Sequence, residues 1–303
     1  MKQEEPILVA IRCTVYNHEP YLRDCLDGFV MQKTNFRFVA VVHDDCSTDN
    51  SVAIIREYAE KYPDIIKPIY ETENQYSKYD GSLGRIMNAA IDATGAKYIA
   101  LCEGDDYWTD PYKLQKQVDF MEAHLKYVAC FHNSRVFNGY RFGLFNSLNE
   151  SHYPSTEDII MRRWFISTQS LMYRNIKIVY PQWTQGVVNG DYLLELMLAK
   201  KGKFYYMDDI MSVYRVQGQG ISAVMNQNKP KMYEGLIYLL SHMKEEYGGL
   251  YAETFDKSIA NYERLKKEAE TELYYAQHSF ARAFRPKTYK RMIKQWLRKK
   301  IDK

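Results

Sequence analysis

The sequence predicts an α/β fold in which a mostly parallel central sheet is flanked by helices, followed by a helical extension. Two patterns support this prediction. In the amino-terminal third, short apolar runs rich in β-branched residues alternate with segments of helical periodicity. From about residue 229 onward, helical periodicity dominates without strand signals. With 303 residues and 46% hydrophobic content, the chain can bury one substantial core and a smaller appendage.

The expected elements follow one another in strict alternation. The strands are predicted at residues 7–13, 38–43, 65–70 and 98–102, and the helices at residues 21–31, 52–62 and 86–93, the last ended by Gly95. A strand that follows a helix in this way is reached by a crossover connection, so neighbouring strands run parallel and helices cover both faces of the sheet.

Polar clusters stand at the carboxyl ends of three of these strands. They are residues 14–17 after the first strand, Asp44 and Asp45 after the second, and residues 103–106 after the fourth. Ligands of open α/β sheets bind at the carboxyl ends of the strands. The three clusters are therefore expected to converge on one crevice.

The acidic run after the fourth strand indicates a cation site. Glu103, Asp105 and Asp106 follow a buried strand, where carboxylates repel one another and lose hydration. Mg²⁺ or Mn²⁺ held by so few protein oxygens keeps open positions that phosphate oxygens usually fill, which points to an enzyme that handles a diphosphate. The alternative is an acidic turn that caps the helix starting near Pro111.

Three motifs in this order resemble the family 2 glycosyltransferases. They are Thr14-Val15-Tyr16-Asn17, His43-Asp44-Asp45-Cys46-Ser47-Thr48-Asp49, and Glu103-Gly104-Asp105-Asp106 with Pro111 and Leu114 behind it. The resemblance covers roughly residues 5–220 and implies a GT-A fold. The sequence shows neither the glycine-rich loop of dinucleotide-binding proteins nor a Walker lysine loop.

The resemblance implies a role for each polar cluster. Tyr16 is expected to stack on the base of a nucleotide-sugar donor, with hydrogen bonds from Thr14 and Asn17. Asp45 matches the family's aspartate that accepts the N3–H of uracil. The alternative is that Asp44 and Asp45 have only a structural role, as a cap for the helix that begins near Ser51.

In the acidic run, Asp106 best matches the metal-binding aspartate of the family. Asp105 comes next, as a second metal ligand or a ribose contact, and Glu103 stands where many relatives carry aspartate. The cation would stabilise the departing nucleoside diphosphate. Trp108 is expected either to line the sugar pocket or to lie in the core.

The catalytic base is expected at Asp191. It follows Gly190 in the first turn of an apolar helix, where the family keeps a catalytic aspartate and where a helix N-terminus favours an ionised carboxylate. The structural alternative is an aspartate that only caps the helix. Glu195, one turn later, is the second candidate. Attack opposite the leaving diphosphate would invert the anomeric configuration.

Two segments depart from the family pattern. Gln217 stands where relatives often carry histidine, so Arg215 is the candidate for contact with metal or diphosphate. Relatives also often carry an Arg-Asn pair near the donor. Here Arg85 lies three residues before Asn88, and we expect Arg85 to be either a phosphate contact or a solvated surface cation.

Composition limits the partners and the compartment. A net charge of +3 is too small to indicate nucleic-acid binding. The 5 cysteines include no CxxC pair, which favours buried thiols in a reducing cytoplasm. No apolar leader or run long enough to span a membrane is seen, so we expect a cytoplasmic protein, with peripheral contact at the inner face of the membrane as an option.

The predicted domains are a glycosyltransferase domain at residues 1–225 and a helical extension at residues 226–303. Residues 285–300 form a basic amphipathic stripe that includes Trp296. This stripe suits an anionic membrane surface, and equally packing on the protein or on another subunit.

The sequence therefore predicts a metal-dependent inverting glycosyltransferase. The expected donor is a UDP-sugar, and the expected acceptor is a glycan or lipid-linked saccharide of the cell envelope. The alternatives are a sugar-phosphate nucleotidyltransferase, which would need a glycine-rich opening segment, and an inactive glycan-binding or scaffold protein of the same fold.

Overall fold

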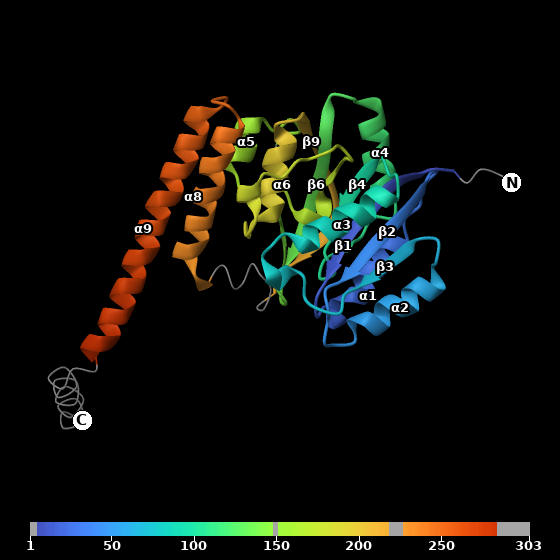
Figure 1. Ribbon diagram of the computed structural model, residues 1–303, viewed down its shortest axis with the longest axis horizontal. Coiled ribbons are helices and arrows are strands. Elements are labelled where there is room, and N and C mark those ends of the chain that lie inside the picture. Colours follow the sequence, from blue (N-terminus) through green and yellow to red (C-terminus); the bar gives the residue numbers. More distant parts are fainter. Residues whose placement is uncertain (1–4, 148–150, 218–226, 284–303) are drawn as a thin grey trace, which may run out of the picture.

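A computed structural model describes residues 5–147, 151–217 and 227–283, with side chains described up to residue 275. In this part of the chain a nine-stranded sheet runs in the order β3-β2-β1-β4-β8-β6-β9-β5, with β7 paired to β6 (Figure 1). The α/β prediction is confirmed, and the sheet is mixed rather than wholly parallel.

The amino-terminal half follows the predicted alternation. The elements are β1 (Ile7–Val15), α1 (Glu19–Val30), β2 (Arg37–Asp44), α2 (Ser51–Lys61), β3 (Ile66–Tyr70), a short 3₁₀ helix η1 (Tyr76–Lys78), α3 (Ser82–Ala93) and β4 (Tyr98–Leu101). Strands β3, β2, β1 and β4 pair in parallel, so their carboxyl ends meet at one edge. Helix α3 begins four residues earlier than predicted, because Gly81 takes a left-handed φ of 78° that starts the helix at Ser82.

The second half adds strands of both directions. Its elements are β5 (Tyr107–Trp108), α4 (Lys113–Ala123), β6 (Tyr127–Phe137), β7 (Phe142–Leu144), α5 (Thr156–Met161), η2 (Thr168–Ser170), β8 (Met172–Arg174), η3 (Gln182–Thr184), α6 (Gly190–Ala199) and β9 (Lys203–Arg215). Strand β8 is antiparallel to β4 and β6, whereas β6 and β9 run parallel. The end of β9 pairs with β5, which brings the segment after β9 beside the acidic run.

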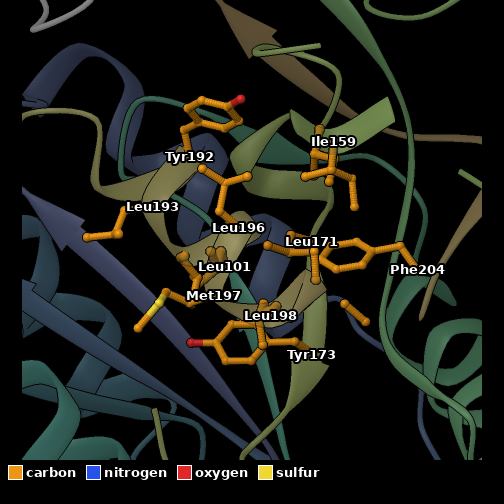
Figure 2. Packing of buried hydrophobic residues seen from close by; sticks show 14 of the residues in the cluster. Leu101, Ile159, Leu171, Tyr173, Tyr192, Leu193, Leu196, Met197, Leu198 and Phe204 are labelled. Carbon is orange, nitrogen blue, oxygen red and sulfur yellow. The ribbon is translucent and has the colours of Figure 1, made fainter. Parts of the chain in front are cut away.

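A hydrophobic layer covers each face of the sheet. Helices α1, α2 and α4 bury their apolar sides on one face, together with Cys13, Cys25 and Cys102. On the other face, Figure 2 shows α6 residues Leu196 and Leu198 packed among the strands. Because α6 is buried along most of its length, its first turn is fixed relative to the strand ends.

Two helices follow the sheet, α8 (Lys229–Glu246) and α9 (Ala252–Ala283), and they lie side by side in Figure 1. Leu236, Leu240 and Phe255 belong to the same buried cluster as α6. The helical extension therefore packs on the core. The predicted basic stripe at residues 285–300 lies outside the described residues, and the division at residue 225 stays a prediction. Among the described helices, none is long and apolar enough to cross a membrane.

Lys113 carries a buried amine within the layer of α4. It is 0% exposed, its Nζ donates to Gln117 Oε1 at 2.7 Å, and Nζ lies 3.9 Å from the centroid of the Trp108 ring. Burial lowers the pKa of Lys113 to about 7. Without a carboxylate contact among its described hydrogen bonds, the amine is held by an amide oxygen and an aromatic face.

The lowered pKa of Lys113 predicts a pH-dependent stability. Between pH 7 and the ordinary pKa of 10.5, the unfolded chain binds a proton that the folded chain lacks, so stability rises with pH by at most about 1.4 kcal/mol per unit. We expect urea unfolding to show this rise from about pH 8 to about pH 9. Lys113→Met should flatten it, while the exposed control Lys201→Met should keep it. Equal slopes in both variants would contradict the buried, neutral lysine.

Candidate functional site

The loops after β1 and β2 are locked together at the crevice. Asn17 Oδ1 accepts the backbone N–H of Thr48 at 2.7 Å, and the Asn17 N–H donates to Ser47 Oγ at 2.9 Å. Asn17 and Cys46 both take left-handed φ angles, 56° and 65°. Asn17, expected to contact a nucleotide, thus holds these two loops in register. Tyr16 beside it is 47% exposed and available for stacking.

The aspartate pair after β2 shapes the next loop. Asp45 is 3% exposed, and its two carboxylate oxygens accept the backbone N–H groups of Gln75 at 2.7 Å and Tyr76 at 3.0 Å. Asp44 Oδ2 accepts the N–H of Ser47 at 3.0 Å. Asp45 therefore pins the start of η1. Each carboxylate oxygen has a second lone pair, so one further donor such as a base N–H can still be accepted.

The acidic run lies at the end of β4 with its carboxylates crowded. Thr14 Oγ1 donates to Glu103 Oε2. Burial, with repulsion from Asp105, raises the pKa of Glu103 to about 7. Asp106 is 2% exposed, and burial, again with repulsion from Asp105, raises its pKa well above the ordinary value. Burial and mutual repulsion therefore favour the protonated forms of Glu103 and Asp106, while Arg12 and Arg215 act in the opposite direction.

The end of β9 and the residues that follow it contact the acidic run. The backbone N–H of Arg215 donates to Asp106 Oδ1 at 2.7 Å, and Arg215 Nη1 donates to the Asp105 carbonyl at 2.9 Å. Gln217 Nε2 donates to Asp105 Oδ2 at 2.9 Å. Both residues of the divergent family segment therefore reach the acidic run, and Gln217 makes its contact as an amide where relatives often carry histidine. Arg215 also pairs with Asp24 of α1.

The donor set fits a divalent cation only when it is completed by a ligand. Within the described residues, no group of three or more His, Cys, Asp or Glu side chains is arranged to hold a metal ion. Mg²⁺ in enzymes is commonly held by one or two carboxylates and by substrate phosphates. Asp105, which is partly exposed, and Asp106, which is buried, are the carboxylates that could take this role together with substrate phosphates, and Glu103 is the third carboxylate of the run.

Asp191 is exposed in the first turn of α6. Its charge contributes to the raised pKa values of Glu103 and Tyr76, so it lies near both the acidic run and the loop held by Asp45. Glu195, one turn later, is 5% exposed, and burial raises its pKa well above the ordinary value. Because its side chain is buried, Glu195 is less accessible to an acceptor hydroxyl than the exposed Asp191 and is the poorer candidate for the base.

Two of the expected site residues lie elsewhere. Trp108 is 2% exposed, donates from Nε1 to the Gln169 carbonyl at 2.8 Å and packs on Phe29, so it belongs to the core and does not line a sugar pocket. The indole N–H of Trp108 already has a hydrogen-bond partner inside the protein. Of the two expected places for Trp108, the sugar pocket and the core, the structure therefore favours the core. Arg85 is exposed and tied to Asp80, and it makes no described contact with the acidic run.

His18 is a site residue that the motifs did not reveal. Its Nδ1 is buried without a hydrogen-bond partner among the described residues. Burial lowers the pKa of His18, while Asp105, Asp49 and Asp44 act in the opposite direction. The ring packs against Gly104, where an added Cβ would lie 2.8 Å from Nδ1. The sequence feature that could have indicated this contact is Gly104, a residue without a side chain between Glu103 and Asp105.

Comparison with known proteins agrees with this geometry. A family model described as Glycosyl transferase family 2 matches residues 12–182. An uncharacterized protein of Mycobacterium tuberculosis is 36% identical over 223 residues, which cover 72% of this chain and 62% of that protein. The putative teichuronic acid biosynthesis glycosyltransferase TuaG of Bacillus subtilis is 26% identical over 218 residues, covering 71% of this chain and 82% of TuaG.

Solved structures share the fold. Staphylococcus aureus TarS 1–349 in complex with UDP-GlcNAc matches with a TM-score of 0.59 and 20% identity, covering 78% of this chain and 66% of that one. The mannosyltransferase PcManGT of Pyrobaculum calidifontis, in complex with GDP-Man and Mn²⁺, matches with a TM-score of 0.56 and 16% identity, covering 95% and 84%. The chain spans 62% of the length of the mycobacterial relative.

The contact between His18 and Gly104 predicts a steric limit in the acidic run. In Gly104→Ala the new Cβ would lie 2.8 Å from His18 Nδ1 and 2.9 Å from Val15 Cγ2. We expect a loss of about 1–3 kcal/mol in the free energy of unfolding, measured in urea. The control Gly84→Ala, on α3 with nothing within 4 Å of its Cβ, should gain about 0.5–1 kcal/mol. Wild-type stability in Gly104→Ala would refute the close packing.

Proposed function

The chain belongs to glycosyl transferase family 2, and on this premise we propose that it is an inverting glycosyltransferase that uses a UDP-sugar. The acceptor is the hydroxyl of a glycan or lipid-linked saccharide. The observation that carries the proposal is the meeting of three polar clusters at the carboxyl ends of parallel strands, with Asp191 facing them from α6.

The nucleotide end of the proposed site is built by the first two loops. Tyr16 offers an exposed ring for the base, and Asp45 offers a free lone pair for a base N–H. The locked loop pair around Asn17 keeps these two groups in fixed relation. The UDP and UDP-GlcNAc complexes of TarS support a uridine nucleotide as the donor.

The diphosphate end is the acidic run. Asp105 and Asp106 would hold Mn²⁺ or Mg²⁺, with Glu103 as a less certain third oxygen donor. The bound cation would supply positive charge against the diphosphate that leaves. Mn²⁺ in the PcManGT complex supports this choice. Arg215 and Gln217 hold the two aspartates from the side of β9.

Asp191 carries the acceptor chemistry. Its carboxylate takes the proton of the acceptor hydroxyl while the hydroxyl oxygen bonds to the anomeric carbon of the donor sugar. The bond from that carbon to the diphosphate oxygen breaks, and its electron pair leaves with the nucleoside diphosphate. Attack and departure on opposite sides of the anomeric carbon give an inverted product.

The proposed biological setting is the synthesis of a cell-envelope polysaccharide. Two relatives support this setting: TuaG, named for teichuronic acid biosynthesis, and the poly(ribitol-phosphate) beta-glucosyltransferase of Bacillus spizizenii, which is 34% identical over 102 residues that cover 33% of this chain and 15% of that protein. A cytoplasmic location, with contact to the membrane surface through residues 285–300, stays part of the proposal. Family membership disfavours the nucleotidyltransferase alternative.

The assignment of the base predicts a sharp contrast between two neighbouring carboxyl groups. Asp191→Asn should lower kcat by about 10²–10⁴-fold, because the acceptor proton loses its base, and should leave UDP binding unchanged. Glu195→Gln, the matched control, replaces a buried carboxyl, whose pKa burial raises, with an amide of similar shape and should keep most of the activity.

These rates are measured as UDP release across a panel of UDP-sugars, with wild type defining the accepted donor. Full turnover by Asp191→Asn would show that Asp191 is not the base. If the wild-type protein neither binds UDP nor releases it from any UDP-sugar, the proposed function itself is wrong.

A further inference from the structure

Trp164 is an exposed aromatic residue on a strained backbone. Its φ is 69°, a left-handed value that bulky side chains rarely adopt, and the side chain is 44% exposed. The next two residues, Phe165 and Ile166, are 3% and 5% exposed. The chain thus buries these neighbours and turns the largest apolar side chain of the segment toward solvent, which neither packing nor backbone preference favours.

Contacts link Trp164 to the proposed base. The guanidinium of Arg163 lies 4.8 Å from the centroid of the Trp164 ring. Arg163 Nη2 donates to Asn189 Oδ1 at 3.0 Å, and Asn189 is the 4% exposed residue that precedes α6, two positions before Asp191. Arg163 therefore joins the ring to the turn that presents the proposed base.

The charge distribution agrees with this placement. Burial lowers the pKa of Arg163, and Asp191 is the first of the carboxylates and phenols that act against this effect. The same guanidinium therefore lies over the Trp164 ring and within electrostatic reach of Asp191. Arg163 Nη1 also contacts Met232 Sδ at 3.4 Å, so α8 supports the arrangement from behind.

The other strained residues are explained differently. Asn17 and Cys46 lock the loops of the nucleotide end. Tyr79, with a φ of 53°, follows η1, the helix that Asp45 pins, and lies with Tyr76 on the donor side. Tyr251, with a φ of 58°, is in the turn between α8 and α9 and packs on Tyr247. Trp164 alone among these described residues adjoins the turn that holds Asp191.

We propose that Trp164 is a binding platform for the acceptor, where the indole receives the apolar face of a hexopyranose ring next to the hydroxyl that is glycosylated. A flat aromatic surface matches the C–H face of a sugar, and its two side-chain torsions lose little entropy on binding. Arg163 is a positioning residue that orients the indole through stacking. This inference rests on the proposed function, since it identifies the acceptor side of that same site.

The test uses the full chain and four variants: Trp164→Ala, Trp164→Tyr, Trp164→Gly and Tyr251→Ala. The last is a matched control, because it truncates an aromatic residue with a similar φ in the turn between the two terminal helices. The probes are soluble tetrasaccharides of glucose, galactose, mannose and N-acetylglucosamine. Their binding is measured by saturation-transfer NMR and titration in the presence of UDP.

Wild type should bind at least one of these probes, and Trp164→Ala should weaken that binding at least about tenfold. Trp164→Tyr should recover part of the affinity, and Tyr251→Ala should match wild type. Release of UDP from the donor without acceptor should stay within about twofold in every variant, because the platform does not touch the nucleotide. If wild type releases no UDP from any UDP-sugar, the proposed function fails, which is distinct from failure of the platform.

Stability separates a binding role from a packing role. Glycine adopts a φ of 69° without strain, so Trp164→Gly should melt at or above the wild-type temperature if the indole serves only a ligand. A clear drop in melting temperature would show that the indole serves packing and would overturn the platform. Absence of wild-type binding to every probe, or equal binding by Trp164→Ala, would overturn it as well.

Discussion

Crowding of carboxylates at the end of β4 is the constraint on which the rest of the site depends. Glu103, Asp105 and Asp106 come together because β4 stops beside β1, and their burial raises the pKa values of Glu103 and Asp106. Arg215 and Gln217 hold two of the three by hydrogen bonds, and Thr14 holds the third. Protonation or an added cation relieves this repulsion. In the proposed function, Mn²⁺ or Mg²⁺ bound between the carboxylates and the diphosphate would supply that positive charge.

The surrounding fold serves to keep this charge in place. Asn17 ties the first two loops together, Asp45 pins the third, and the buried body of α6 fixes the position of the turn that carries Asp191. Left-handed residues lie in these same loops, where a strained backbone persists because several hydrogen bonds determine it. The mixed part of the sheet also positions the site, because the pairing of β9 with β6 and β5 brings the Arg215 N–H to Asp106.

The alternation of apolar runs and helical periodicity in the sequence predicted the first half of the fold and the residues at its strand ends. Alternating apolar runs place Asp45 and Glu103 at chain positions that parallel pairing then brings together. The order of β8, β6, β9 and β5 depends on contacts far apart in sequence, for which the chain has no local signal. The burial of Trp108 and the approach of His18 to Gly104 depend on such contacts too. The hydrogen bond from Arg163 to Asn189, which connects the Trp164 segment to the turn before Asp191, is likewise a contact between separate loops that the local sequence does not indicate.

The dependence of nucleotide binding on the cation tests the central claim most directly. Isothermal titration would measure the affinity for UDP in Mn²⁺ and in EDTA, for wild type and for Asp105→Asn and Asp106→Asn. Binding at least about tenfold tighter in Mn²⁺, with that gain reduced in both variants, is the predicted result, because the carboxylates and the diphosphate share one ion. Equal affinity for UDP with and without Mn²⁺ would contradict the carboxylate cluster as a cation and diphosphate site.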